Sequence, residues 1–337
     1  MDRRSLICTL AAAAAVPLAG EARAAATVAA GNLSNANATA EARALYRYLC
    51  LVSQRKKTLT GQQTSTWDGE TGPELERIET VTGELPAIIG LDFIDPLTCN
   101  VTIDRAVGWY KNQGGIPTIC WHWGNPLVGP GYDQSKIYFD IWDALKPGTR
   151  ENVAMMADLD RIAGYLGDIQ KQGVPVLWRP FHEFSGDWFW WGKGGPELFK
   201  KLWVKMYDYF TTEKKLNNLI WVLGYTGEPS EKYYPGRQYV DIVGADTYVK
   251  DHGSLKALYD RVVAIAGTDM PIPLHECGPI PDPDALTADG ADWAYFMTWC
   301  YEFILDGKTN PDDFLKRAYT SDRYISLNEV PPFTQFS

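Results

Sequence analysis

The sequence predicts an α/β protein, a TIM (β/α)8 barrel made of a single domain. Short β-rich apolar runs recur along the chain, and most are followed by turn residues and a helical pattern. Several runs are continuously apolar, as expected for parallel strands that are buried on both faces. No linker between domains is found along the chain. The eight expected strands are Thr58–Gln62, Ala87–Asp92, Pro117–His122, Pro175–Arg179, Leu219–Leu223, Ile242–Asp246, Ile272–His275 and Ala294–Thr298.

Helical segments between these runs support the alternation. Before the fourth run, apolar residues at helical spacing form a stripe that ends at Gly173, a residue suited to helix termination. Between the fourth and fifth runs, Pro196 opens a helix whose apolar stripe contains Leu198, Leu202 and Met206. Alternating strands and helices that add up to eight favour a closed barrel over an open doubly wound sheet.

The N-terminus has the features of an export signal. Arg3 and Arg4 precede an apolar run over residues 6–19, and a small-x-small pattern ends at Ala24. We therefore expect residues 1–24 to be cleaved, and the general and twin-arginine routes both fit this segment. The apolar run is too short to span a bilayer. No other run approaches the roughly 20 apolar residues that a membrane-spanning helix needs.

The remaining chain divides into a lead-in and a barrel. A stretch rich in Ser, Asn and Ala indicates a mobile lead-in over residues 25–45. Residues 46–337 are expected to form the (β/α)8 barrel, with a C-terminal helix and tail packed against it. We expect an exported protein, periplasmic or secreted, and a monomer.

The charge balance argues against nucleic acid as a partner. The chain has 32 Lys and Arg residues against 42 Asp and Glu residues, a formal net charge of -10 at pH 7. A protein that binds phosphate backbones needs a basic surface. The aromatic content is high instead, with 13 Trp, 18 Tyr and 12 Phe. Such side chains offer flat apolar surface for binding a flat ligand.

The cysteines give no metal or redox motif. Cleavage of the export signal removes Cys8 and leaves an odd number, so at least one thiol stays free. Cys50 and Cys99 could form a disulfide. No CxxC spacing exists, so the cysteines do not predict a zinc ribbon. The remaining three lie in or beside apolar runs and are expected to be buried; they are Cys120, Cys277 and Cys300.

Two carboxylates stand at the ends of expected strands. Glu183 follows the fourth strand and Glu276 follows the seventh. Active sites of this fold lie at the carboxyl ends of the strands, so both side chains are expected in one cleft. Glycoside hydrolysis requires such a pair, because one acid protonates the leaving oxygen while the other attacks or activates water. The alternative is that each glutamate forms a structural ion pair.

An aromatic stretch lies close to the first of these glutamates. Residues 188–192 read Trp-Phe-Trp-Trp-Gly, flanked by Gly186 and Asp187 rather than by a periodic core pattern. Sugar rings present a C–H face that stacks on exposed indoles. The sequence therefore favours a carbohydrate-binding loop here.

Together these segments resemble family-26 glycoside hydrolases, the bacterial and fungal β-mannanase family. The strongest match is Trp178–Glu183 followed by Trp188–Gly192, which is similar to the acid/base segment of that family. Similar segments occur in the family's order over roughly residues 55 to 300; they are Gly114–Pro126, Asn218–Val222 and Tyr234–Tyr248.

The resemblance implies a retaining endo-β-1,4-mannanase that acts on β-mannan and needs no cofactor or metal. It implies that Glu183 is the acid/base and Glu276 the nucleophile. Retention with a covalent glycosyl-enzyme intermediate requires their carboxyl groups to lie about 5 to 5.5 Å apart.

The same resemblance implies further residues that bind substrate or support the two glutamates. His182 is expected to form a hydrogen bond near the nucleophile, and Tyr248 is expected to lie beside the nucleophile. Trp188 is expected to stack at the cleavage site. Arg179 is expected near Glu276, where its charge keeps the carboxyl group ionised. The others are expected to line the pocket; they are His122, Trp191, Asp246 and Trp299.

The residues around Glu276 depart from the family pattern. His275 and Cys277 flank it, where the family has a small hydroxyl residue before and an aromatic or aliphatic residue after the nucleophile. Side chains alternate in a strand, so both flanking residues are expected to point away from the side chain of Glu276.

Two readings of a different class remain. Three histidines near strand ends could hold zinc at a barrel mouth and make the protein a metal-dependent hydrolase; they are His122, His182 and His275. No HxH or HExxH spacing supports this. An inactive carbohydrate-binding protein would keep the aromatic groove without catalysis.

The sequence leaves the substrate and the mode of attack open. Mixed-linkage β-glucan and xylan are alternatives to mannan for the same mechanism. Endo or exo attack depends on loops that open or block the ends of the cleft. The segment over residues 129–152, which contains Tyr132 and Trp142, could do either.

Overall fold

The computed structural model describes residues 31–68 and 72–336. Eight parallel strands form a closed barrel in chain order, which confirms the predicted fold class. The barrel strands are β2 (Gly61–Gln63), β3 (Ile88–Asp92), β4 (Ile116–Cys120), β5 (Val176–Arg179), β6 (Leu219–Tyr225), β7 (Ile242–Thr247), β8 (Leu274–Cys277) and β9 (Phe296–Thr298). The expected export signal over residues 1–24, which includes Cys8, lies outside the described residues.

Two of the expected strands differ in a way that matters for the site. The first expected strand divides, because β1 (Thr58–Leu59) pairs with β10 (Tyr324–Ile325) outside the barrel and only β2 belongs to it. The seventh was expected to end at residue 275, but β8 continues to Cys277.

The pairing between β7 and β8 contains a bulge. Ala245 is opposite Leu274 and Asp246 is opposite Glu276, so His275 is an extra residue on β8. A bulge interrupts the alternation of side chains along a strand. It allows two consecutive residues of β8 to point toward the inside of the barrel.

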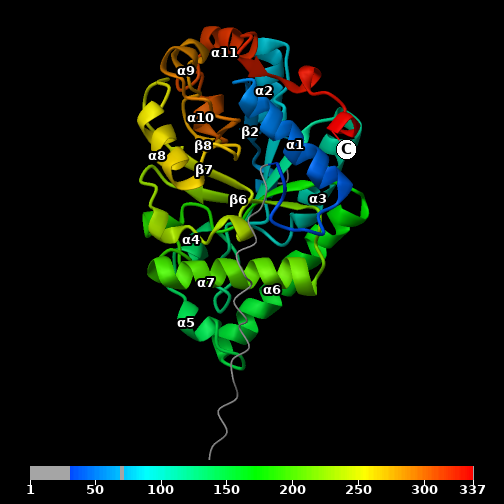
Figure 1. Ribbon diagram of the computed structural model, residues 1–337, viewed down its shortest axis with the longest axis vertical. Coiled ribbons are helices and arrows are strands. Elements are labelled where there is room, and N and C mark those ends of the chain that lie inside the picture. Colours follow the sequence, from blue (N-terminus) through cyan, green and yellow to red (C-terminus); the bar gives the residue numbers. More distant parts are fainter. Residues whose placement is uncertain (1–30, 69–71, 337) are drawn as a thin grey trace, which may run out of the picture.

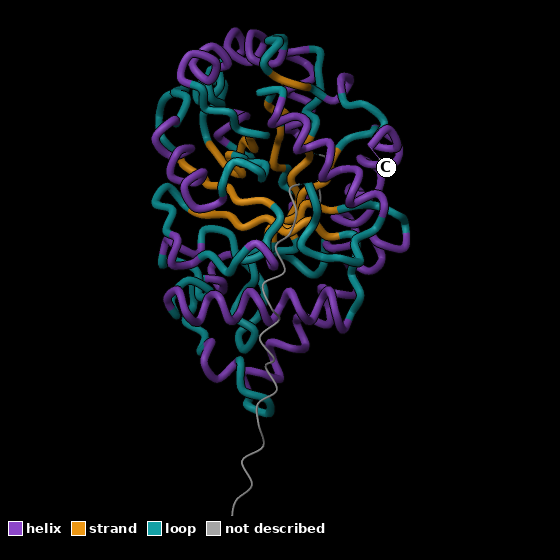
Figure 2. The backbone as a smooth tube through the Cα atoms, in the orientation of Figure 1, coloured by secondary structure: helices purple, strands orange, loops and turns teal. Residues whose placement is uncertain are grey.

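Helices surround the barrel on all sides (Figures 1 and 2). The longer ones are α1 (Ala40–Gln54), α2 (Pro73–Thr82), α3 (Cys99–Gln113), α6 (Arg150–Lys171), α7 (Gly195–Asp208), α8 (Lys256–Ala266) and α11 (Asp312–Tyr319). Four short helices lie in connecting segments; they are α4 (Tyr132–Ser135), α5 (Ile141–Ala144), α9 (Pro283–Asp289) and α10 (Glu302–Leu305).

The two helices anticipated from their apolar stripes form for the expected reasons. The side chain of Thr149 accepts a hydrogen bond from the backbone N–H of Asn152 and so caps the start of α6. Gly173 follows α6 with a φ of 69°, a left-handed conformation that glycine adopts without strain. In α7 the proline lies in the first turn, and Leu202 and Met206 are buried.

The segment expected as a mobile lead-in is instead packed over its described part. Leu33 is buried, and the backbone N–H of Ser34 donates a 2.6 Å hydrogen bond to Oδ1 of Asp241. Helix α1 begins at Ala40, six residues before the expected start of the barrel domain at 46, and Thr39 caps it. These residues cover the end of the barrel where the strands begin, so they bury apolar surface that the strand pattern alone does not reveal.

The C-terminal segment packs against the barrel's helical layer. Beyond α11 the chain forms β10 and returns toward α1 and α3 (Figure 1). The ring of Phe333 stacks on Tyr110 at 5.6 Å and meets the edge of Tyr48 at 5.7 Å.

Cysteines and membrane segments can be read directly from the described residues. Cys50 and Cys99 are free thiols, so the structure does not contain the disulfide that the sequence allowed. Cys120, Cys277 and Cys300 are free and buried.

Over residues 31–68 and 72–336, no helix combines the length and hydrophobicity that crossing a bilayer requires.

Candidate active site

A pocket of about 440 Å³ opens at the carboxyl ends of the barrel strands. Every lining residue ends a strand or lies in the segment after one, as the fold leads one to expect. The lining comprises Trp67, Ile94, His122, Tyr132, Glu183, Tyr248, Glu276, Trp299, Tyr301 and Phe303. The two glutamates singled out in the sequence therefore share one pocket. A second cavity of about 500 Å³ lies among residues that precede the strands and contains neither glutamate.

The backbone around Glu183 is held in an unusual conformation. Glu183 has a φ of 56° and Phe181 a φ of 51°, both in the left-handed region. Such a conformation costs non-glycine residues on the order of 1–3 kcal/mol and persists where the surroundings enforce it. The backbone N–H of Glu183 donates a 2.9 Å hydrogen bond to the carbonyl of Gly224 on β6. This contact fixes the turn that projects the carboxyl group into the pocket.

The surroundings of Glu183 favour its protonated form. Burial, and then the negative charge of Glu276, raise its pKa from 4.5 to about 7. A hydrogen bond of 2.8 Å from Nε1 of Trp188 to Oε2, together with positive charge on His122 and Arg179, opposes this rise. A carboxyl group with a pKa near neutrality can give and take a proton at working pH.

Glu276 has the opposite environment. Its Oε2 lies 3.0 Å from Nη1 of Arg179, and its Oε1 accepts a hydrogen bond from the hydroxyl of Tyr248. Burial lowers the pKa of Arg179. The negative groups around the guanidinium, among them Glu276 and Asp246, outweigh burial and raise this pKa, so Arg179 remains a cation. The carboxyl group of Glu276 therefore contacts a cation and a hydroxyl donor.

His275 does not point away from Glu276, and the bulge in β8 is the reason. Nη1 of Arg179 donates to Nδ1 of His275 at 3.1 Å as well as contacting Glu276. Since arginine only donates, Nδ1 of His275 is an acceptor, and Nε2 donates to the carbonyl of Tyr225 at 3.0 Å. Burial and then the charge of Arg179 hold the pKa of His275 well below its usual range. Both ring nitrogens of this histidine are thus engaged.

A zinc site made of the three histidines does not fit this arrangement. His275 has no free lone pair, so it cannot serve as a third imidazole ligand. Asp246, His275 and Glu276 form another group whose possible ligand atoms lie close together. Since both ring nitrogens of His275 are engaged in hydrogen bonds, this group has no imidazole nitrogen left for a metal. The donor set therefore favours hydrogen bonds over metal coordination here.

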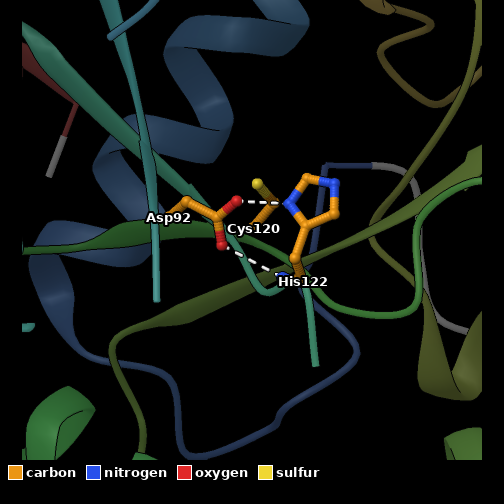
Figure 3. A group of neighbouring side chains, drawn as sticks. All are labelled: Asp92, Cys120 and His122. Carbon is orange, nitrogen blue, oxygen red and sulfur yellow. Dashed lines mark hydrogen bonds and ion pairs between the residues drawn. The ribbon is translucent and has the colours of Figure 1, made fainter. Parts of the chain in front are cut away.

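A second cluster lies at the ends of β3 and β4 and contains Asp92, Cys120 and His122 (Figure 3). Oδ1 of Asp92 accepts a 3.0 Å hydrogen bond from the backbone N–H of His122, and Oδ2 accepts one from Nδ1 of the same residue. Burial, and then the charge of Asp92, raise the pKa of the Cys120 thiol well above its usual range. A protonated thiol and an engaged carboxylate fit a hydrogen-bonded pair better than a metal site.

His182 lies below the pocket and contacts His122 rather than the nucleophile. Its Nε2 is 3.1 Å from Nε2 of His122, and the ring is fully buried. His182 thus makes its hydrogen bond to His122, which lines the same pocket as Glu276. Burial, and then the positive charges of His122 and Arg179, hold the pKa of His182 well below its usual range.

Most of the aromatic stretch after Glu183 belongs to the core. Trp188 is 41% exposed, whereas Phe189, Trp190 and Trp191 are at most 1% exposed. Nε1 of Trp191 donates to the carbonyl of His182 at 2.8 Å, and its ring stacks on Phe189. The expectation that Trp191 contacts substrate is wrong, because its ring supports the loop from below.

Asp246 also lies beneath the pocket rather than in its lining. It is 3% exposed, and its Oδ2 has no hydrogen-bond partner among the described residues. Burial, and then the charges of Glu183 and Glu276, hold its pKa well above the usual range. The family resemblance implied that Asp246 lines the pocket, but its side chain lies outside the lining. Trp299 and Tyr248 do line the pocket.

Comparison with known proteins gives a consistent result over most of the chain. A profile of glycosyl hydrolase family 26 matches residues 34–326. A mannan endo-1,4-β-mannosidase from Thermothelomyces thermophilus is 34% identical over 316 residues, which cover 89% of this chain and 63% of that protein. A mannan endo-1,4-β-mannosidase from Bacillus subtilis is 36% identical over 245 residues, 66% of this chain and 65% of that protein.

The chain belongs to glycosyl hydrolase family 26.

Solved structures of β-mannanases are similar to this chain over most of its length. A β-(1,4)-mannanase from Podospora anserina gives a TM-score of 0.81 at 34% identity, covering 90% of this chain and 69% of that one. A β-mannanase from a symbiotic protist of the termite Reticulitermes speratus, complexed with gluco-manno-oligosaccharide, gives 0.81 at 32% identity, covering 89% and 98%. This chain spans less than two thirds of the length of the two curated relatives named above.

The pocket of this family 26 chain includes residues that the sequence reasoning missed. Trp67 and Tyr301 were not anticipated, although their rings lie 6.1 Å apart in the lining and Trp67 stacks on Trp299 at 6.3 Å. The spacing of Trp299 and Tyr301 after the last strand was an available signal. Asp92 was assigned only to a strand, since nothing in the sequence shows that its carboxylate reaches His122.

Proposed function

We propose that this chain is a retaining endo-β-1,4-mannanase that hydrolyses mannans such as galactomannan and glucomannan by double displacement. Glu183 is the acid/base and Glu276 the nucleophile. The observation that carries the proposal is the unequal environment of two carboxyl groups in one pocket. The pKa of Glu183 is raised to about 7, while Glu276 faces Arg179 and the hydroxyl of Tyr248. Environments that differ in this way separate an acid from a nucleophile.

The reaction proceeds in two steps, and Glu183 acts as an acid in the first and as a base in the second. In the first, an oxygen of Glu276 attacks the anomeric carbon while protonated Glu183 gives its proton to the departing glycosidic oxygen, so the departing part of the chain leaves with a free hydroxyl. In the second, ionised Glu183 takes a proton from water, whose oxygen displaces Glu276 from the anomeric carbon. Two inversions leave the product with the original β configuration.

The lining residues are suited to holding a neutral sugar. Trp299 in the lining supplies a half-buried indole, and Trp188, which donates to the lining residue Glu183, supplies an exposed one for the C–H faces of the ring. His122 and Tyr248 supply polar atoms beside the two glutamates. Arg179, His182 and Asp246 act from beneath by fixing the charges and positions of those groups. Trp191 is left out of this set.

Mannan is the favoured substrate because the curated relatives are mannan endo-1,4-β-mannosidases. Mixed-linkage β-glucan and xylan remain alternatives for the same mechanism. One structural neighbour is the family 26 domain of a Prevotella bryantii protein titled endo-β-mannanase/endo-β-glucanase, which keeps glucan worth testing.

The test is to incubate residues 25–337 with soluble β-mannan, mixed-linkage β-glucan and xylan, with and without chelator, and to size the products. Short manno-oligosaccharides in amounts unaffected by chelator are the expected result. Release of only single sugars would contradict endo attack, and activity on glucan or xylan alone would contradict the mannan assignment. Loss of activity in chelator, restored by zinc, would support a metal-dependent hydrolase. Tight glycan binding with no product would support a binding protein.

The stereochemistry of the product tests retention separately. Proton NMR of a fresh digest should show the β anomer of the new reducing end first, with the α anomer appearing only through mutarotation. Initial formation of the α anomer would mean an inverting enzyme and would remove Glu276 from the role of nucleophile.

Export and the monomeric state are part of the same proposal. Expressed with its first 24 residues, the chain should leave the cytoplasm and begin near residue 25, as intact mass would show. In sizing experiments with light scattering, the mature protein should elute with the mass of one chain. Retention of residues 1–24, or a dimer at micromolar concentration, would contradict these points.

A further inference from the structure

The buried carboxylate of Asp92 accepts two hydrogen bonds from one residue, His122. Asp92 ends β3 and is fully buried, and His122 follows β4, the neighbouring strand. Oδ1 accepts from the backbone N–H of His122 at 3.0 Å and Oδ2 accepts from Nδ1 of its ring (Figure 3). A two-point contact of this kind fixes both the backbone and the ring plane of the histidine.

These contacts also determine where the ring protons lie. A carboxylate only accepts, so Nδ1 of His122 carries a proton. Nε2 of His122 faces Nε2 of His182 at 3.1 Å, and one of these two nitrogens must donate. Burial and nearby positive charge hold the pKa of His182 well below its usual range, so the ring of His182 is neutral. When Nε2 of His182 accepts, His122 carries protons on both nitrogens, and the one proton of His182 lies on Nδ1, a buried atom with no hydrogen-bond partner among the described residues.

The charged groups around His122 support a cation at this position. Asp92 faces it from β3, Glu276 from β8 and Glu183 from the segment after β5. Burial alone would lower the pKa of His122, but the charge and hydrogen bond of Asp92, with the two glutamates, outweigh burial and raise it. On its own strand the Cys120 thiol stays protonated, and Arg179 is directed to Glu276.

We propose that Asp92 is a positioning residue of the active site, which fixes the orientation, tautomer and positive charge of His122 and so sets the proton balance between Glu183 and Glu276. Asp92 does not line the pocket and acts only through His122, which does. Without the carboxylate, His122 loses the partner of Nδ1 and the charge that offsets burial. Since positive charge on His122 lowers the pKa of Glu183, neutral His122 lets that pKa rise. The inference rests on the proposed roles of the two glutamates.

The test compares Asp92→Asn with the wild type in two measurements. Asparagine keeps the shape but places either a neutral acceptor or an N–H group against Nδ1, as when the aspartate of a histidine dyad is replaced. We expect kcat/KM on mannan to fall by about 10- to 100-fold, the cost of losing a partner that orients a metal-binding histidine, taken as a guide for a histidine held in the same way. We also expect the alkaline limb of the pH profile to move to higher pH, because Glu183 holds its proton longer. An unchanged limb would contradict the proposal.

Nitrogen-15 NMR of the imidazoles gives a readout that needs no turnover. The chain has only 4 histidines, so the signals of His122 can be assigned by their loss in His122→Gln. At pH 6.5, where an ordinary imidazole is about half protonated, the wild-type ring should be mostly doubly protonated and the Asp92→Asn ring mostly singly protonated. A wild-type His122 without a proton on Nδ1 would overturn the proposal even if the variant fails to fold. This spectrum stays valid if no glycan is cleaved, so failure of the proposed function is seen separately.

Two control variants separate positioning from stability. Asp241→Asn removes another fully buried carboxylate that accepts from backbone N–H groups, those of Ser34 and Trp221, at the other end of the barrel. It should lower the melting temperature without moving the pH limb. Cys120→Ser changes the third member of the cluster in Figure 3, keeps a hydrogen-bond donor beside the carboxylate of Asp92, and should leave the alkaline limb in place. A limb that moves equally in Asp241→Asn would show a general effect of destabilisation and overturn the assignment.

Discussion

At the scale of single residues, the two glutamates differ because of what surrounds them rather than because of their chemistry. Glu183 is buried beside a second carboxyl group, which raises its pKa to about 7. Glu276 faces a buried cation and a hydroxyl donor. The strand pattern located both carboxyl groups, but it could not say which is protonated, because that depends on neighbours from other strands.

Removing each glutamate should have effects that depend on the leaving group. Glu183→Gln should lower kcat on mannan by about 10²- to 10⁴-fold, the usual contribution of a general acid. An aryl mannoside with a good leaving group needs little protonation to depart when Glu276 attacks. The rate of the first step in Glu183→Gln should therefore recover with this substrate, and stopped-flow measurements should show a burst of released aryl group. Glu276→Gln should show no burst with either substrate. A burst in the latter variant would contradict its assignment as the nucleophile.

The pH dependence should follow the proton on Glu183. Because the acid must be protonated, kcat/KM is expected to fall as pH rises past about 7. Trp188→Phe removes the Nε1 donor that lowers the pKa of Glu183. The alkaline limb of the profile of kcat/KM against pH should therefore move to higher pH. The shift should be at most about 1 unit, since a hydrogen bond to a charged group contributes about 1.5 kcal/mol and Trp188 is partly exposed. Trp142→Phe, an exposed tryptophan outside the pocket lining, is the control and should leave the limb in place.

At the scale of elements, the bulge in β8 decides which side chains meet. It adds His275 to the strand between two paired positions, so that both His275 and Glu276 reach Arg179. A prediction from the sequence assumes that side chains alternate strictly along a strand. It therefore placed His275 on the face of β8 opposite to Glu276. No residue type in this segment indicates a bulge, since neither glycine nor proline lies between residues 274 and 277.

Close packing against His275 gives a test of this arrangement. A Cβ atom at Gly224 would lie 2.7 Å from Nε2 of His275, so Gly224→Ala must displace the ring or β6. Displacement should move Arg179 and lower kcat/KM, with a loss of stability of about 1–3 kcal/mol from overpacking. Gly164→Ala in α6 meets no atom within 4 Å and should raise stability by about 0.5–1 kcal/mol. Urea unfolding and steady-state kinetics measure both, and full activity in Gly224→Ala would contradict the role of His275.

At the scale of the whole molecule, segments far apart in the sequence close the barrel at the end opposite the pocket. Residues 33–38 and α1 cover the beginnings of the strands, and the C-terminal Phe333 packs on α1 and α3. The pocket therefore lies at one end of a barrel whose other end is sealed by both ends of the described chain.

Removing the N-terminal cover should cost stability without touching the site. A chain that begins at residue 40 loses the burial of Leu33, worth about 1.5–3 kcal/mol, and the Thr39 cap of α1, worth about 0.5–2 kcal/mol. It should unfold at a lower urea concentration than residues 25–337. Its kcat at low temperature should stay the same, because no residue before 40 lines the pocket. Equal stability of the two chains would contradict a structural role for this segment.

The sequence by itself determined the barrel, its eight strands and the family, because these follow from local patterns that repeat along the chain. It also brought Glu183 and Glu276 to one pocket, since all strand ends of a parallel barrel meet at one rim. Only the tertiary structure decided that Trp191 is core, that His182 binds His122, that Asp92 holds His122, and that residues from 33 onward belong to the fold. The physical reason is that burial, hydrogen-bond partners and pKa values depend on neighbours contributed by other strands, which no local pattern contains.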